Sequence, residues 1–204
     1  MNEKKLIIEQ TFTLAIKNHK KNNFQIAENL YKEVLKKNPN HFEALFYLGI
    51  LLGQIKRFDS AIPLLKKAIQ TKPNHAIALN NLGNMQGELG EYENAISSYE
   101  KAIAIQPNDA MAYNNLGILL QDLGENQKAI SSYEMAVKNE PENLSYLYLL
   151  SRVNERILNS NLKKKIYKII KKKNCTKKNI AYGNFLLSRY ELKAKKYKNE
   201  FNHL

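Results

Sequence analysis

Pairs of asparagines are the residues of this chain best suited to recognise another molecule. Asn80 and Asn81 open the phrase NNLGNMQGELGEYENAISSYEKAI, and Asn114 and Asn115 open the near-copy NNLGILLQDLGENQKAISSYEMAV. Asparagine is a mediocre residue for a helix interior, because its side chain competes for backbone hydrogen bonds. On a surface that faces a ligand, its amide can pair with the N–H and the C=O of one residue of an extended peptide. The alternative is that these asparagines are merely tolerated on a solvated surface.

No constellation of side chains points to catalysis. The four histidines (His19, His41, His75 and His203) are scattered, and the single Cys175 has no second thiol for a disulfide or a metal site. No glycine-rich loop is followed by Lys and Ser or Thr, as a phosphate cradle requires. The sequence therefore predicts no enzyme activity, no cofactor and no metal.

The net charge of +13 lies entirely at one end of the chain. Residues 1–143 carry equal numbers of basic and acidic side chains, 16 of each, whereas residues 144–204 carry 16 basic and 3 acidic ones. The candidates for contact with an anionic partner are Lys163, Lys164, Lys165, Lys171, Lys172 and Lys173. Because 28 of the 32 basic residues are Lys, sequence-specific nucleic-acid recognition is not expected. The lysines form either a solvated face or a nonspecific contact with an anionic surface.

Signals for export or membrane insertion are missing from the sequence. Residues 1–20 lack the apolar core of a signal peptide, and no apolar run approaches the ~20 residues that span a bilayer. We therefore expect a soluble, cytoplasmic protein.

A repeat with a fixed period organises most of the chain. A proline recurs every 34 residues, at Pro39, Pro73, Pro107 and Pro141. Each lies in a short segment that ends one helix and precedes the next. When each of these prolines is counted as position 32 of its unit, a small residue recurs at position 8, Ala at position 20 and Tyr or Leu at position 24. These positions follow helical spacing on two successive helices, and the composition favours an all-α fold. Small residues at positions 8, 20 and 27 are expected to let paired backbones approach, with Leu at position 7 and Tyr at position 24 filling the space between neighbouring pairs.

The pattern resembles the tetratricopeptide repeat, a helical-pair motif of the same period. Four full units are predicted, at residues 8–41, 42–75, 76–109 and 110–143. The resemblance implies an all-α, right-handed α-solenoid of stacked helix-turn-helix units, whose concave wall is lined by the first helix of each unit.

The same resemblance implies which side chains face the concave groove, at positions 2, 5, 6, 9, 12 and 13 of each unit. The candidate contacts for a protein or peptide partner are Tyr47, Ile50, Asn80, Asn81, Asn84, Glu88, Asn114, Asn115, Ile118 and Asp122. The asparagines are also similar to the ladder that holds extended polypeptide in the repeats of O-linked GlcNAc transferases. None of Asn80, Asn81 and Asn84 is expected to be needed for packing between repeats.

After Asn143 the pattern decays into a Lys-rich capping region of degenerate fifth and sixth units, residues 144–204. Helices are predicted at 144–158, 161–173 and 179–201, the second of them as the partner of the first. Phe201 and Leu204 end the chain within the apolar pattern, either as part of the cap or as the front of something longer. The favoured function is a non-catalytic scaffold that binds an extended peptide. The alternative is the recognition module of a larger sulfotransferase or glycosyltransferase whose catalytic domain lies outside this chain.

Overall fold

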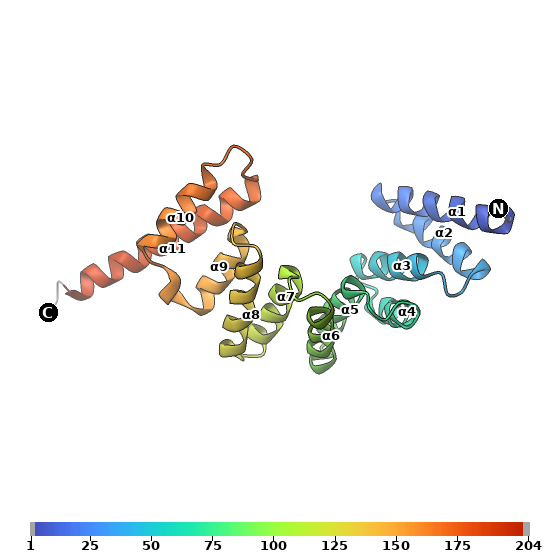
Figure 1. Ribbon diagram of the computed structural model, residues 1–204, viewed down its shortest axis with the longest axis horizontal. Helices are drawn as coiled ribbons and strands as arrows, with labels where there is room; N and C mark the ends of the chain where they lie inside the picture. Colours follow the sequence, from blue (N-terminus) through green and yellow to red (C-terminus); the bar gives the residue numbers. More distant parts are fainter. Residues whose placement is uncertain (1–2, 202–204) are drawn as a thin grey trace. The chain divides into compact units, whose positions relative to one another are not determined.

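The protein is built from paired α-helices. The computed structural model (Figure 1) describes the backbone of residues 3–201 and the side chains of residues 3–195, and this part of the chain contains no β-strand. The predicted all-α fold is confirmed. His203 and Leu204 lie outside the described residues, and so does the side chain of Phe201.

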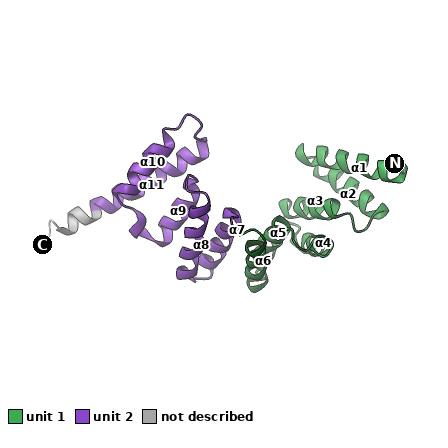
Figure 2. Ribbon diagram, in the orientation of Figure 1, with its two compact units in different colours: residues 1–107 green, residues 108–204 purple. Residues whose placement is uncertain are grey.

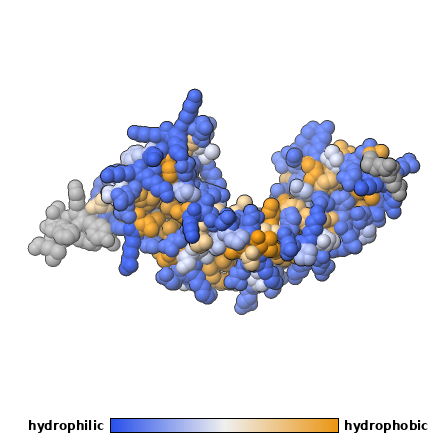
Figure 3. Space-filling view, in the orientation of Figure 1, coloured by the Kyte–Doolittle hydropathy of each residue, from blue (hydrophilic) through white to orange (hydrophobic). Residues whose placement is uncertain are grey.

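Two compact units divide the chain, residues 1–107 and 108–204 (Figure 2). The first contains α1 (Glu3–Lys20), α2 (Phe24–Lys37), α3 (Phe42–Gln54), α4 (Phe58–Thr71), α5 (Ala76–Glu88) and α6 (Tyr92–Ile105). The second contains α7 (Ala110–Asp122), α8 (Asn126–Asn139), α9 (Leu144–Val153), the short 3-10 helix η1 (Glu155–Ile157), α10 (Ser160–Ile170) and α11 (Lys177–Phe201). The surface in view is largely hydrophilic, with apolar areas exposed within each unit (Figure 3).

Helix pairing follows from the small residues at position 8. A Cβ added at Gly83 would lie 2.7 Å from the ring of Tyr99, and one added at Gly117 would lie 2.8 Å from the ring of Tyr133. The recurring glycine thus lets α5 press against α6, and α7 against α8, with a tyrosine filling each contact. The alanines at position 20 are fully buried at the same crossings: Ala27, Ala61, Ala95 and Ala129.

Side-chain caps start the first helix of each later pair. The Nδ1 atoms of His41 and His75 accept hydrogen bonds from the backbone N–H groups of Ala44 and Ala78, at 3.3 and 3.1 Å. Asp109 and Asn143 occupy the equivalent positions before α7 and α9 and cap them through side-chain oxygens. The two histidines therefore have a structural role, because each satisfies an otherwise unpaired donor at a helix start.

Leu14 departs from the expectation for position 7. Its counterparts Leu48, Leu82 and Leu116 are buried, whereas Leu14 is 47% exposed. Leu6 and Ile7, on the same helix, are also exposed. The physical reason is that α1 is the first helix of its unit, so none of the described residues forms a preceding repeat that covers this face.

The C-terminal region does not continue the pairing. The sequence predicts the 161–173 helix as the partner of α9, but α11 packs directly against both α9 and α10, and α9 scarcely touches α10. Asn179 of α11 accepts a hydrogen bond from Leu144 N at 2.7 Å and donates one to Glu142 O at 2.8 Å, which caps the start of α9. Ile166 and Ile169 of α10 are buried in this cluster. The close helix pairing of the earlier repeats is not continued between α9 and α10, because position 20 is the long Lys163 in place of a small Ala.

Candidate functional site

Residues at the predicted groove positions of α1 and α3 line an open pocket of about 430 Å³ in the first unit. Seven of its eight lining residues occupy groove positions of the first two repeats: Phe12, Ile16, His19, Lys20, Tyr47, Ile50 and Gln54. Tyr47 and Ile50 are among the residues singled out from sequence, and both are half-buried. The cavity is apolar at its walls and carries one cationic side chain, which suits an apolar ligand group beside an anionic or polar one.

Ring contacts and a histidine hold these walls in place. The ring of Phe12 lies 6.1 Å from that of Tyr47, and Tyr47 stacks on Tyr31 with their centroids 6.5 Å apart. His19 lies 3.2 Å from the Tyr31 hydroxyl through Nδ1 and 2.9 Å from Gln54 Oε1 through Nε2. A neutral imidazole with its proton on Nε2 satisfies both contacts, because it donates to Gln54 and accepts from Tyr31. Burial raises the pKa of Tyr31, so this phenol stays neutral and available as a donor.

The asparagines of α5 fall into different environments. Asn81 is partly exposed, and its Nδ2 donates to Ile77 O at 2.8 Å, which leaves its acceptor oxygen without a partner among the described residues. Glu88, one helical turn beyond Asn84, is exposed. Asn80 is only 4% exposed, so it offers almost no surface to a ligand. Asn81 is therefore the asparagine of this helix best placed for contact with a partner.

Asn84 has a structural role that the sequence did not reveal. Its Oδ1 accepts a hydrogen bond from the Tyr99 hydroxyl at 2.8 Å, and Tyr99 is buried. Burial, with a smaller contribution from Glu88, raises the pKa of Tyr99. The expectation that Asn84 is not needed for packing is therefore wrong: it satisfies a buried hydroxyl of α6.

Each tyrosine at position 24 has a polar hydrogen-bond partner for its hydroxyl on the first helix of its repeat. Tyr31 is held by His19, Tyr99 by Asn84 and Tyr133 by Gln121 at 2.9 Å. In the second repeat, position 24 is Leu65, and the corresponding groove positions are the apolar or small Ile50 and Gly53. The signal was available in the sequence as this co-occurrence of a tyrosine with a polar residue at position 9 or 12.

Replacing Asn84 by Ala is expected to lower the free energy of unfolding by ~1–3 kcal/mol, because the Tyr99 hydroxyl would lose its acceptor. Asn81→Ala is the matched control and is expected to change stability by less than ~0.5 kcal/mol. Urea denaturation followed by circular dichroism measures both. Adding Tyr99→Phe to Asn84→Ala should recover part of the loss; a fully additive double variant would contradict the assigned bond.

In unit 2, further residues at the predicted groove positions lie on α7. Ile118 is 39% exposed and Asp122 is also exposed. Asn114 Nδ2 lies 3.5 Å from Asn115 Oδ1, and Asn114 Oδ1 is buried without a hydrogen-bond partner in the described part of the chain. A buried carbonyl oxygen without a donor destabilises the folded state, so this asparagine does not contribute to stability through that atom.

The lysines of the C-terminal region divide into paired and unpaired ones. Lys163 Nζ lies 2.5 Å from a carboxylate oxygen of Glu191, and this hydrogen bond raises the pKa of Lys163. Lys172 forms an ion pair with Glu142 and lowers the pKa of the Glu142 carboxyl. The remaining candidates are Lys164, Lys171 and Lys173, which are exposed, and Lys165, which is half-buried. Part of the positive charge is thus used to hold α10 and α11 in place, and anionic contact stays a prediction for the rest.

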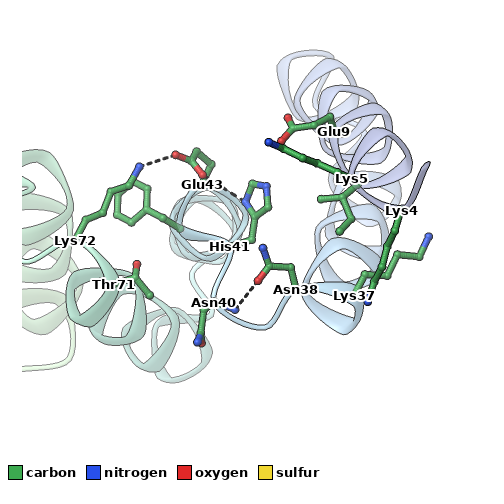
Figure 4. A pocket seen from close by; sticks show the side chains of 12 residues that line it. Lys4, Lys5, Glu9, Lys37, Asn38, Asn40, His41, Glu43, Thr71 and Lys72 are labelled. Carbon is green, nitrogen blue, oxygen red and sulfur yellow. Dashed lines mark hydrogen bonds and ion pairs between the residues drawn. The ribbon is translucent and has the colours of Figure 1, made fainter. Parts of the chain in front are cut away.

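A further pocket of about 590 Å³ lies beside the start of α1 and the loop before α3 (Figure 4). Lys72 bridges to Glu43 at 2.7 Å and lies 4.2 Å above the ring of Phe42. These contacts tie the end of α4 to the start of α3. In residues 3–195 no three His, Cys, Asp or Glu side chains gather in a way that could hold a metal ion, and no described helix is long and apolar enough to cross a membrane.

Family models of the tetratricopeptide repeat match the chain over residues 20–75, 64–97, 87–124 and 110–143. Together these segments cover residues 20–143 without a gap. The chain belongs to the tetratricopeptide repeat family. No curated protein matches it by sequence.

Solved structures share the repeat fold. The crystal structure of MamA is 29% identical with a TM-score of 0.67, and the match covers 89% of this chain and 96% of that one. A thermophilic tetratricopeptide protein from Thermus thermophilus matches 89% of this chain and 98% of its own at 19% identity, with a TM-score of 0.66. The O-GlcNAc transferase of Thermobaculum terrenum matches 68% of this chain but only 27% of its own, at 24% identity and a TM-score of 0.62. At these last two identities the likeness shows the fold alone. The family and the fold are those of protein–protein interaction scaffolds.

Proposed function

We propose that this repeat protein is a non-catalytic scaffold that binds an extended segment of a partner protein along the groove-facing side chains of its repeats. The observation that supports this most directly is the cavity between α1 and α3, because groove positions of two successive repeats line it. Its volume of about 430 Å³ and its aromatic and aliphatic lining are in the range of known ligand pockets.

The cavity and Asn81 of α5 supply different parts of recognition. Phe12, Ile16 and Ile50 offer an apolar wall for one bulky side chain of the partner, and Lys20 lies at the same cavity. Asn81 offers an acceptor oxygen to a backbone N–H group. Side-chain burial supplies affinity, and the amide fixes the direction of the bound strand.

Substituting Ile50 by Asn is expected to weaken peptide binding by ~10-fold, which corresponds to ~1.4 kcal/mol. Asn81→Ala is expected to weaken binding by ~2- to 10-fold, the usual contribution of one hydrogen bond. The ligands are peptides selected from a random displayed library on the wild-type protein, with affinities measured by calorimetry.

The control is Glu93→Ala, an exposed residue of α6 that lines none of the cavities described above. Circular dichroism verifies that each variant is folded. Selected peptides that bind both groove variants as tightly as the wild type would overturn the proposal.

The second candidate is the recognition module of a larger transferase. The match to the O-GlcNAc transferase supports it, because the shared part is a repeat region that makes up 27% of that chain. A reading frame that continues past Leu204 into a nucleotide-sugar or nucleotide-sulfate domain would favour this candidate over a free-standing scaffold.

A further inference from the structure

A third pocket lies on the opposite side of α5 from the predicted groove positions. It has a volume of about 690 Å³ and is lined by Lys66, Ile69, Gln70, Pro73, Asn74, Leu79, Leu82, Gln86, Asn94, Ser97, Ser98, Lys101, Ala104 and Ile105. Leu79, Leu82 and Gln86 follow one face of α5, whereas Asn81, Asn84 and Glu88 follow the opposite one at 3.6 residues per turn. A ligand here would thus be bound independently of the groove.

The charge of this pocket is of one sign. Lys66 of α4 and Lys101 of α6 are exposed, and no Asp or Glu lines the pocket. Neither lysine forms an ion pair or a side-chain hydrogen bond with a described residue. Other lysines of the unit do have carboxylate partners, as Lys32 has Glu28 and Lys72 has Glu43. An unbalanced pair of cations across a concave surface favours an anionic ligand.

A buried amide also faces this pocket. Gln86 is 3% exposed, and its Oε1 accepts a hydrogen bond from Ser98 Oγ at 2.6 Å. Its Nε2 donates no hydrogen bond to any residue between 3 and 195. Nε2 is not one of the fully buried unpaired atoms of the described residues, so it can donate from the pocket wall to a carboxylate or carbonyl oxygen of a ligand.

The rest of the lining is apolar. Leu79 and Leu82 form the floor from α5, and Ile69, Pro73 and Ile105 contribute from the flanking elements. Ile105 is 38% exposed. A small inorganic anion would leave these aliphatic groups uncovered, whereas an acidic peptide segment with an aliphatic side chain would cover them and reach both lysines.

We propose that the pocket between α4, α5 and α6 is a second docking site, which binds an acidic protein segment through Lys66, Lys101 and Gln86. The aliphatic side chain of the segment rests on Leu79 and Leu82, and its carboxylates pair with the lysines. The scaffold would then have two separate binding faces in its first unit. This site does not depend on whether the groove binds peptide.

The test uses the full chain, labelled with ¹⁵N, and the peptide acetyl-Asp-Glu-Leu-Glu-Asp-amide at millimolar concentration. Amide chemical shifts of α4 and α6 and the side-chain amide of Gln86 are expected to move on titration. The double variant Lys66→Gln/Lys101→Gln should weaken binding by roughly two- to thirtyfold, as for the loss of two exposed ion pairs. The groove variant Ile50→Asn should bind this peptide as the wild type does.

The matched control is Lys17→Gln/Lys36→Gln, which removes the same charge from exposed positions of α1 and α2 outside the pocket. Equal loss in this control would show general attraction to a basic chain and would overturn the proposal. So would shifts confined to α1 and α3, or no shifts at all. If inorganic phosphate alone caused the same chemical-shift changes as the peptide, the pocket would bind simple anions, and the proposal of a peptide site would be overturned.

Discussion

Replacing Tyr133 by Ala is expected to lower the free energy of unfolding of the second unit by ~3–5 kcal/mol, the usual cost of removing a buried aromatic ring. Tyr133 is fully buried between α8 and α7, with Gly117 directly against its ring. The neighbouring residues Gly117, Ala129 and Ala136 have no side chain large enough to fill the cavity that the ring would leave. A loss of this size approaches the whole stability of a small helical unit.

Tyr133→Phe separates the ring from its hydroxyl. This variant keeps the packing and removes the donor to Gln121 Oε1, so a loss of only ~1 kcal/mol is expected. Burial, with a contribution from Asp122, raises the pKa of Tyr133 to about 12, so the phenol remains a donor across the usual range of pH. Urea denaturation gives the total change, and hydrogen exchange of peptides from α7 and α8 locates it. A Tyr133→Ala variant within ~1 kcal/mol of wild type would contradict the role given to this ring.

Gly183→Val is expected to destabilise the C-terminal cluster by ~1–3 kcal/mol, because the site has no room for a larger residue. A Cβ at this position would lie 2.6 Å from Ile170 Cγ2 and 3.0 Å from Leu144 Cδ1. To avoid these contacts α11 must move away from both α9 and α10. That movement would also break the cap that Asn179 places on the start of α9.

Limited trypsin digestion measures this effect, since α11 is rich in lysine. We expect faster cleavage after Lys177, Lys178 and Lys193 in Gly183→Val than in the wild type, while α7 and α8 keep their resistance. Asn184→Ala, at an exposed neighbouring position of the same helix, is the control and should digest as the wild type does. Equal resistance of all three proteins would show that α11 does not depend on this close contact.

The repeat itself could be predicted from sequence because its packing rules are local. Each close glycine–tyrosine contact joins two successive helices that are connected by one short turn, as Gly83 with Tyr99 and Gly117 with Tyr133. The fixed period carries such pairs forward from unit to unit, so prolines and small residues are enough to predict the helices. The prediction weakened after Asn143, where the small residue at position 20 gives way to Lys163. There α11 took the place beside α9 through Asn179 and Gly183, which both contact Leu144, far earlier in the chain.

By itself, the sequence determined the helical pairs and the repeat family, because both depend on residue type at a fixed period. Only the tertiary structure decided what the residues at the predicted groove positions do. It buried Asn80, gave Asn84 to the hydroxyl of Tyr99, and formed an open pocket lined by Phe12 and Tyr47. It also brought Lys66 and Lys101 to one pocket without a carboxylate. Burial and hydrogen bonding depend on which side chains meet across neighbouring helices, and a periodic pattern fixes the position of a side chain but not its partner.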